Sequence, residues 1–331
     1  MCPLLTDRIC SERFGRDREF SRSSCFDAGD RASAHIVDAL LSSGRAQLEW
    51  IADHRTPLLD LLARLLTALG DEPFLLFFVA LGYWAVHRRT FARAALLLIL
   101  AVLLNAWLKG IFREARPQVE PLVQADGWSF PSGHAQAAAA MWGWLALHVR
   151  RRVGAAALWI LALGVASSRP YLGVHYLHDV GVGFVLGAAQ LGLYRAWQNR
   201  EPFLRTWLSP AAQWAAGLTV VGSWVVFGFD ETVVGGGVRL FGALVGLGLG
   251  WLRESARDVM RPPHALWARA GTVGIGTLGL VAIWLGLSVL YRQAGVDGVL
   301  PLQFIRYVLV GLWISAGAPT VARRLFGPAA H

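Results

Sequence analysis

Residues 130–147 read FPSGHAQAAAAMWGWLAL, a short polar stretch followed by a largely apolar run. Pro131 and Ser132 are residue types that begin helices, and the free backbone N–H groups of a helix start favour an anion. Gly133 has no Cβ, so a ligand can approach the backbone closely there. The pattern therefore predicts a membrane helix over 134–149 whose first turn faces an anionic ligand. The alternative interpretation is an ordinary capped helix that begins with an interfacial histidine.

The composition places the rest of the chain in a bilayer. Of 331 residues, 55% are hydrophobic and 16% are charged, and the mean hydropathy is +0.45. The charges lie in short runs between apolar stretches about as long as a helix needs to cross hydrocarbon. We expect an all-α fold, a polytopic integral membrane helical bundle of about nine transmembrane helices with an N-terminal amphipathic helix. The expected spans are 73–87, 91–108, 134–149, 153–168, 177–195, 213–229, 238–252, 271–291 and 302–320.

Four regions follow from this pattern. Residues 1–33 are polar and aperiodic, which is typical of a disordered or interfacial tail, and no apolar core of a signal peptide follows the basic start. Residues 34–70 carry charges at helical spacing and predict amphipathic helices on the membrane surface. Residues 71–200 form the helical core that holds the polar motifs, and 201–331 form an accessory region of four transmembrane helices. The three cysteines, all in the tail, have no metal-like spacing and receive no role: Cys2, Cys10 and Cys25.

The net charge of +9 is explained by membrane topology. Arginines cluster in every second connection between the predicted spans, and none of these clusters forms one continuous basic face, which argues against a nucleic-acid partner. By the positive-inside rule the arginine-rich connections are cytoplasmic. The alternate connections, which include 109–133 and 169–176, are then extracytoplasmic. Both lie on the same side of the membrane.

The first of these connections opens with two cations. Lys109 is the only lysine among 31 basic residues, and Arg116 follows seven positions later, directly before Pro117. An ammonium group acts as a point charge and a guanidinium group as a planar fork, and both suit a phosphate. The alternative is that both side chains extend to lipid headgroups.

The second connection carries Arg169, His175 and Asp179. Because His175 and Asp179 are four residues apart, a helix places the carboxylate within reach of one imidazole nitrogen. A carboxylate that fixes the imidazole is what a nucleophilic or acid–base histidine requires. A loop-holding His–Asp pair is the alternative. We expect His178, one residue before Asp179, to point about 100° away from it and to be a loop or interface residue.

Taken together, these positions supply three cations, a hydroxyl group, a helix start and two histidines, with no cluster that resembles a metal site. The charge of a phosphoryl-transfer transition state spreads over three oxygens, so catalysis consists largely of positioning and electrostatic stabilisation. The set therefore predicts a phosphoryl site. Asn105, one turn before Lys109, is expected to form an interhelical hydrogen bond, although it could also orient the phosphate loop.

The three motifs resemble the tripartite signature of the type 2 phosphatidic acid phosphatase and vanadium haloperoxidase superfamily, in its membrane lipid phosphatase branch. The resemblance covers roughly residues 55–197 and is complete at the signature positions; Pro170 and Leu177 depart from the common pattern without touching a chemical group. It implies that 71–200 is a phosphatase catalytic core with no cofactor and no metal. It also implies catalytic roles for His175 as nucleophile, Asp179 as its orienting partner and His134 as acid and base. The implied phosphate-binding residues are Lys109, Arg116, Ser132, Gly133 and Arg169.

The resemblance implies an integral membrane phosphatase, in the bacterial inner (plasma) membrane, that hydrolyses a lipid phosphate or diphosphate through a phosphohistidine at the extracytoplasmic face. Phosphatidate, phosphatidylglycerophosphate and polyprenyl diphosphate all fit as substrates. A soluble sugar phosphate, vanadate-dependent halide oxidation and a scaffold that has lost its chemistry are the alternatives. Besides the lipid substrate and membrane lipids, a homodimer is left open. The glycines at 242, 246 and 250 predict close helix packing in the accessory region.

Overall fold

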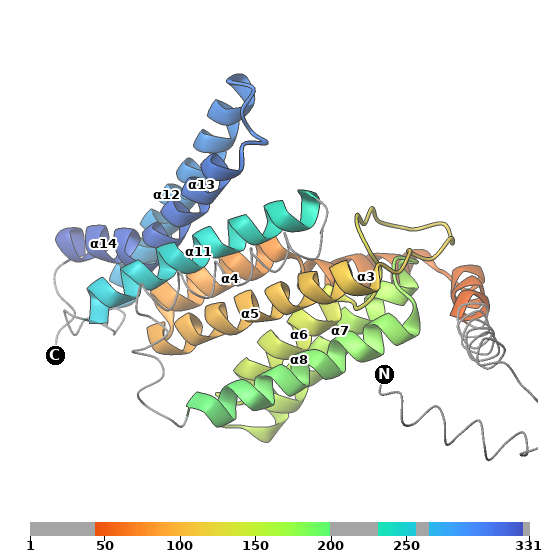
Figure 1. The fold of residues 1–331 in the computed structure, drawn as a ribbon. Helices are drawn as coiled ribbons and strands as arrows, with labels where there is room; N and C mark the ends of the chain where they lie inside the picture. The colour runs from red at the N-terminus through yellow and green to blue at the C-terminus, as the bar shows by residue number, and fades with distance from the viewer. Residues whose placement is uncertain (1–43, 199–230, 256–264, 327–331) are drawn as a thin grey trace, which may run out of the picture.

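The computed structural model describes residues 44–198, 231–255 and 265–326, and these residues form helices joined by turns and loops (Figure 1). The all-α prediction is confirmed within these ranges. A helix at 44–53 comes before the labelled elements. The labelled helices are α3 (Pro57–Ala68), α4 (Glu72–Ala85), α5 (Arg88–Phe112), α6 (Gly133–Ala146), α7 (Arg152–Tyr171), α8 (Leu177–Gln198), α11 (Glu231–Ser255), α12 (Leu266–Gln293), α13 (Leu300–Leu312), the π-helix η1 (Trp313–Gly317) and α14 (Ala318–Phe326).

Eight of the nine predicted segments coincide with helices, and the ninth, 213–229, lies outside the described residues. The count of nine spans is not confirmed. Five helices among the described residues are long and apolar enough to cross a bilayer, or six if α3 and α4 together form one broken span. Helix α6, with 14 residues, is about 21 Å long and thus shorter than a hydrocarbon core of about 30 Å.

The predicted boundary at residues 70 and 71, between surface helices and core, falls inside a bend of 56° between α3 and α4. Helix α3 packs against α7 of the core. The described part of the predicted amphipathic segment is also interrupted at residues 54–56, where Thr56 caps α3 and Pro57 occupies its first turn. A single N-terminal amphipathic helix is therefore not confirmed, and residues 34–43 lie outside the described part.

Helix α6 lies between α7 and α8 and is buried along most of its length. Its small alanine side chains let both neighbours approach closely. On α8, a Cβ at Gly183 would collide with the backbone oxygen of Ser132, and one at Gly187 would collide with that of Gln136. These two glycines therefore hold the beginning of α8 against the beginning of α6.

The C-terminal helices pack on the core through α4. The side chain of Trp84 donates a hydrogen bond to the Ile314 carbonyl (2.9 Å), and the Tyr83 hydroxyl donates to that of Ser315 (3.1 Å). Both carbonyls belong to η1, whose wider turn changes the hydrogen-bonding pattern of the helix. The predicted close packing at the α11 glycines is present, because a Cβ at Gly246 would collide with the backbone of α13.

Candidate active site

Four helix ends meet at one end of the core: the ends of α5 and α7 and the beginnings of α6 and α8 (Figure 1). The Ser132 backbone N–H donates to the Asp179 carbonyl oxygen (3.0 Å), which joins the α6 and α8 starts. The Arg116 guanidinium donates to the Val174 carbonyl oxygen (2.8 Å) and thereby ties the 113–132 loop to the segment before α8. The two polar stretches, 109–134 and 169–179, therefore lie side by side.

The His175–Asp179 pair forms at the start of α8. One carboxylate oxygen of Asp179, Oδ2, lies 3.3 Å from Nδ1 of His175 and also accepts hydrogen bonds from the Tyr176 backbone N–H (2.9 Å) and the Ser129 hydroxyl. Both His175 and Asp179 are buried. Ser129, in the loop before α6, was not predicted, because a single serine in a loop gives no sequence signal for this role.

The hydrogen bonds indicate which nitrogen of His175 carries the proton. Nε2 lies 3.3 Å from Nη1 of Arg116, and a guanidinium group can only donate, so Nε2 is the acceptor and Nδ1–H faces Asp179. His175 lies in the segment between α7 and α8. Burial, aided by nearby cations and opposed by Asp179, lowers its pKa to about 3. The imidazole is therefore neutral at physiological pH, with Nε2 unprotonated.

The predicted phosphate-binding cations are held by backbone and side-chain oxygens. Lys109 donates to the Trp128 carbonyl (2.7 Å), and Arg116 also donates to the Gly127 and Asp126 carbonyls. Arg169, at the end of α7, donates from Nη1 to the Thr67 hydroxyl of α3. Each cation is thus fixed in place by the protein.

Besides Oδ1 of Asp179, whose contact with His178 is an ion pair, two buried polar atoms at the site have no hydrogen-bond partner among the described residues. They are the Ser132 hydroxyl, at the first turn of α6, and Nε of Arg169. Buried polar groups are almost always satisfied, so two such atoms in one site favour a polar ligand. Gly133 lies next to them, and a Cβ there would come 3.0 Å from Oδ1 of Asn105.

Asn105 fulfils both roles that the sequence left open. Its amide donates to the Pro131 carbonyl (3.1 Å), which orients the loop before α6, and to the side chain of Gln136 (2.9 Å), which is an interhelical bond. Gln136 in turn donates to Gln190 of α8 (2.9 Å).

His134, at the start of α6, pairs with a residue that the sequence did not single out. Its Nε2 lies 2.7 Å from Oδ1 of Asp71, in the bend between α3 and α4. Asp71 belongs to none of the sequence motifs. The bend between α3 and α4 brings it to the site.

The prediction for His178 was wrong. Its Nε2 lies 3.1 Å from Oδ1 of Asp179 and 2.9 Å from Oε1 of Glu114. The angular argument failed because side chains in the first helical turn lean back toward the N-terminus, where the ring stacks on Tyr176. Glu114, His178 and Asp179 are close enough to hold a metal ion, a cluster that the sequence did not predict. An imidazolium between two carboxylates accounts for the same contacts.

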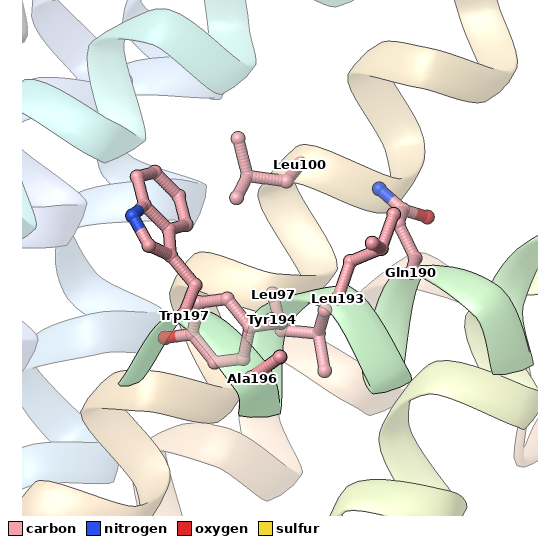
Figure 2. A pocket seen from close by; sticks show the side chains of 7 residues that line it. All are labelled: Leu97, Leu100, Gln190, Leu193, Tyr194, Ala196 and Trp197. Atoms are coloured by element: carbon pink, nitrogen blue, oxygen red, sulfur yellow. The ribbon is translucent and has the colours of Figure 1, made fainter. Parts of the chain in front are cut away.

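A cavity of ≈470 Å³ lies between α5 and α8, away from the polar site (Figure 2). None of the predicted site residues lines it. Its lining is largely apolar and comprises Leu97, Leu100, Gln190, Leu193, Tyr194, Ala196 and Trp197.

Comparison with known proteins gives two family matches. A model described as the PAP2 superfamily matches residues 90–203, and one described as the transmembrane extension of PAP2 superfamily phosphatases matches residues 238–330. The chain is 32% identical over 182 residues to phosphatidylglycerophosphatase B of Bacillus subtilis (strain 168). This match covers 51% of this chain and 90% of the relative. It is 27% identical over 148 residues to sphingosine-1-phosphate phosphatase 2 of Mus musculus. This match covers 41% of this chain and 42% of the relative.

Two solved structures are also similar. The crystal structure of a transmembrane PAP2-type phosphatidylglycerolphosphate phosphatase from Bacillus subtilis has 27% sequence identity and a TM-score of 0.47, and covers 51% of this chain and 91% of its own. The crystal structure of Aquifex aeolicus LpxE has 26% sequence identity and a TM-score of 0.42. It covers 46% of this chain and 93% of its own. The family models and the relative that is matched over 90% of its length establish that the chain belongs to the PAP2 superfamily.

Proposed function

We propose that this membrane protein hydrolyses a lipid phosphate or diphosphate through a phosphohistidine formed on His175. The observation that carries the proposal is the presentation of His175: its unprotonated Nε2 faces Arg116, and its Nδ1 faces Asp179. A nucleophile backed by a carboxylate and placed beside cations is suited to attack a phosphate.

In the first step, Nε2 of His175 attacks phosphorus, and the bond from phosphorus to the leaving oxygen breaks. His134 donates a proton to that oxygen, so an alcohol or a phosphate leaves. The phosphorylated imidazole carries a positive charge, which Asp179 stabilises. Lys109, Arg116 and Arg169 offset the charge on the phosphoryl oxygens.

In the second step, a water molecule attacks phosphorus and the bond from phosphorus to Nε2 breaks. His134, now neutral, accepts a proton from the water. Inorganic phosphate leaves, and both imidazoles return to their starting states. Every proton in this scheme is carried by a side chain of the protein, so we expect no metal requirement.

A lipid substrate is supported by the family match and by the relatives found. The relative from Bacillus subtilis is named for phosphatidylglycerophosphate, which makes that lipid the first substrate to test. The arginine-rich connections support a site at the extracytoplasmic face of the membrane.

The test is phosphate release by purified protein in detergent, with dioctanoyl phosphatidylglycerophosphate, dioctanoyl phosphatidate, a polyprenyl diphosphate and glucose 6-phosphate as substrates. We expect turnover of at least one lipid, unchanged by EDTA, and no turnover by His175→Ala. Turnover of glucose 6-phosphate alone would favour a soluble substrate, and full activity of His175→Ala would refute the proposed nucleophile.

A further inference from the structure

The end of α3 and the bend that follows it make three contacts with the site. The Thr67 hydroxyl accepts a hydrogen bond from Arg169, and Asp71 contacts His134 at 2.7 Å. Between them, a Cβ at Gly70 would lie 3.1 Å from Cδ2 of the His134 ring and 2.7 Å from the side chain of Val165, so glycine leaves room for the imidazole. The bend is thus fitted to the ring of His134.

Asp71 occupies the N-cap position of α4, where an aspartate ordinarily accepts a hydrogen bond from the first turn of the helix. Its side chain forms no such bond. The carboxylate points to Nε2 of His134 instead. Helix capping therefore does not explain the orientation of the Asp71 carboxylate. Its contact with the imidazole of His134 explains that orientation.

The pair also determines the proton positions on His134. A carboxylate can only accept, so the hydrogen of Nε2 lies between the ring and Asp71. Nδ1 has no hydrogen-bond partner among the described residues and is the nitrogen left to gain or lose a proton.

We propose that Asp71 is a positioning residue that holds the His134 ring and leaves Nδ1 to carry the transferable proton. This inference rests on the proposed phosphatase function. When the leaving oxygen takes the proton from Nδ1, the bond between Nε2–H and Asp71 remains, and Asp71 itself stays ionised. Asp71 stabilises the imidazolium before the transfer, as a carboxylate does for a catalytic histidine.

The test compares two substrates that differ in their need for an acid: decyl phosphate, with a poor leaving group, and p-nitrophenyl phosphate, with a good one. In Asp71→Asn we expect kcat/KM for decyl phosphate to fall about 10- to 100-fold, because an acid contributes most when the leaving group is poor. The value for p-nitrophenyl phosphate should change little. Glu72→Gln, which removes a neighbouring exposed carboxylate, serves as the matched control and should behave as the unaltered protein.

Equal losses on both substrates, no loss on either, or loss of the folded helical signal in Asp71→Asn would overturn the positioning role. Failure of the proposed function gives a different result, since the unaltered protein would then release phosphate from neither substrate.

Discussion

Replacement of Asp179 by asparagine tests the charge that the mechanism places behind His175. The amide keeps the shape of the side chain and an oxygen for the Tyr176 N–H and the Ser129 hydroxyl, but it removes the negative charge. The phosphorylated imidazole would then carry its positive charge close to Lys109, Arg116 and Arg169 with no carboxylate beside it.

The size of the effect follows from the geometry. Nδ1 and Oδ2 are 3.3 Å apart, which corresponds to charge centres about 4 to 5 Å apart. With an effective dielectric constant of about 20, the lost attraction is about 3 to 4 kcal/mol. That difference lowers kcat about 10²- to 10³-fold.

The assay is phosphate release at saturating lipid phosphate by Asp179→Asn, with Asp297→Asn as a control that removes an exposed carboxylate in the α12–α13 turn. Thermal unfolding in the same detergent checks that both variants are folded. A folded Asp179→Asn protein with the kcat of the unaltered chain would refute the argument.

Three further predictions concern packing and pH. Gly183→Ala should destabilise the protein by about 1 to 3 kcal/mol, because its Cβ would collide with the Ser132 backbone. Gly181 faces open space, so Gly181→Ala should not destabilise the protein, and thermal unfolding compares the two variants. Because the pKa of His175 is about 3 in the folded protein and about 6.5 when unfolded, stability should fall as pH drops from about 6.5 toward 3, and this dependence should weaken in His175→Gln. Trp84→Phe should cost about 1 to 3 kcal/mol of stability, since it leaves a buried carbonyl of η1 without its donor.

The helices of the core could be predicted because their apolar runs are interrupted by arginine clusters at regular intervals. The number of spans could not, since hydropathy does not distinguish a spanning helix from a short buried one such as α6. The break between α3 and α4 was predicted at residues 70 and 71, but its angle of 56° was not, because a boundary between two segments does not give their relative orientation.

The residues of the three motifs could be brought together from sequence because motif order and charge bias agreed on one side of the membrane. Asp71, Thr67 and Ser129 could not, because each is a common residue type without a spacing signal. The error at His178 has a different origin: the helical rule was applied at a helix start, where loop residues such as Glu114 also reach the side chain.

The central claim is a covalent bond between phosphorus and Nε2 of His175. Rapid quenching of His134→Ala with p-nitrophenyl phosphate, whose good leaving group needs no acid, should trap the second step. Mass spectrometry at alkaline pH should then detect a phosphoryl group on the peptide that contains His175. A phosphoryl group on any other residue would contradict the account.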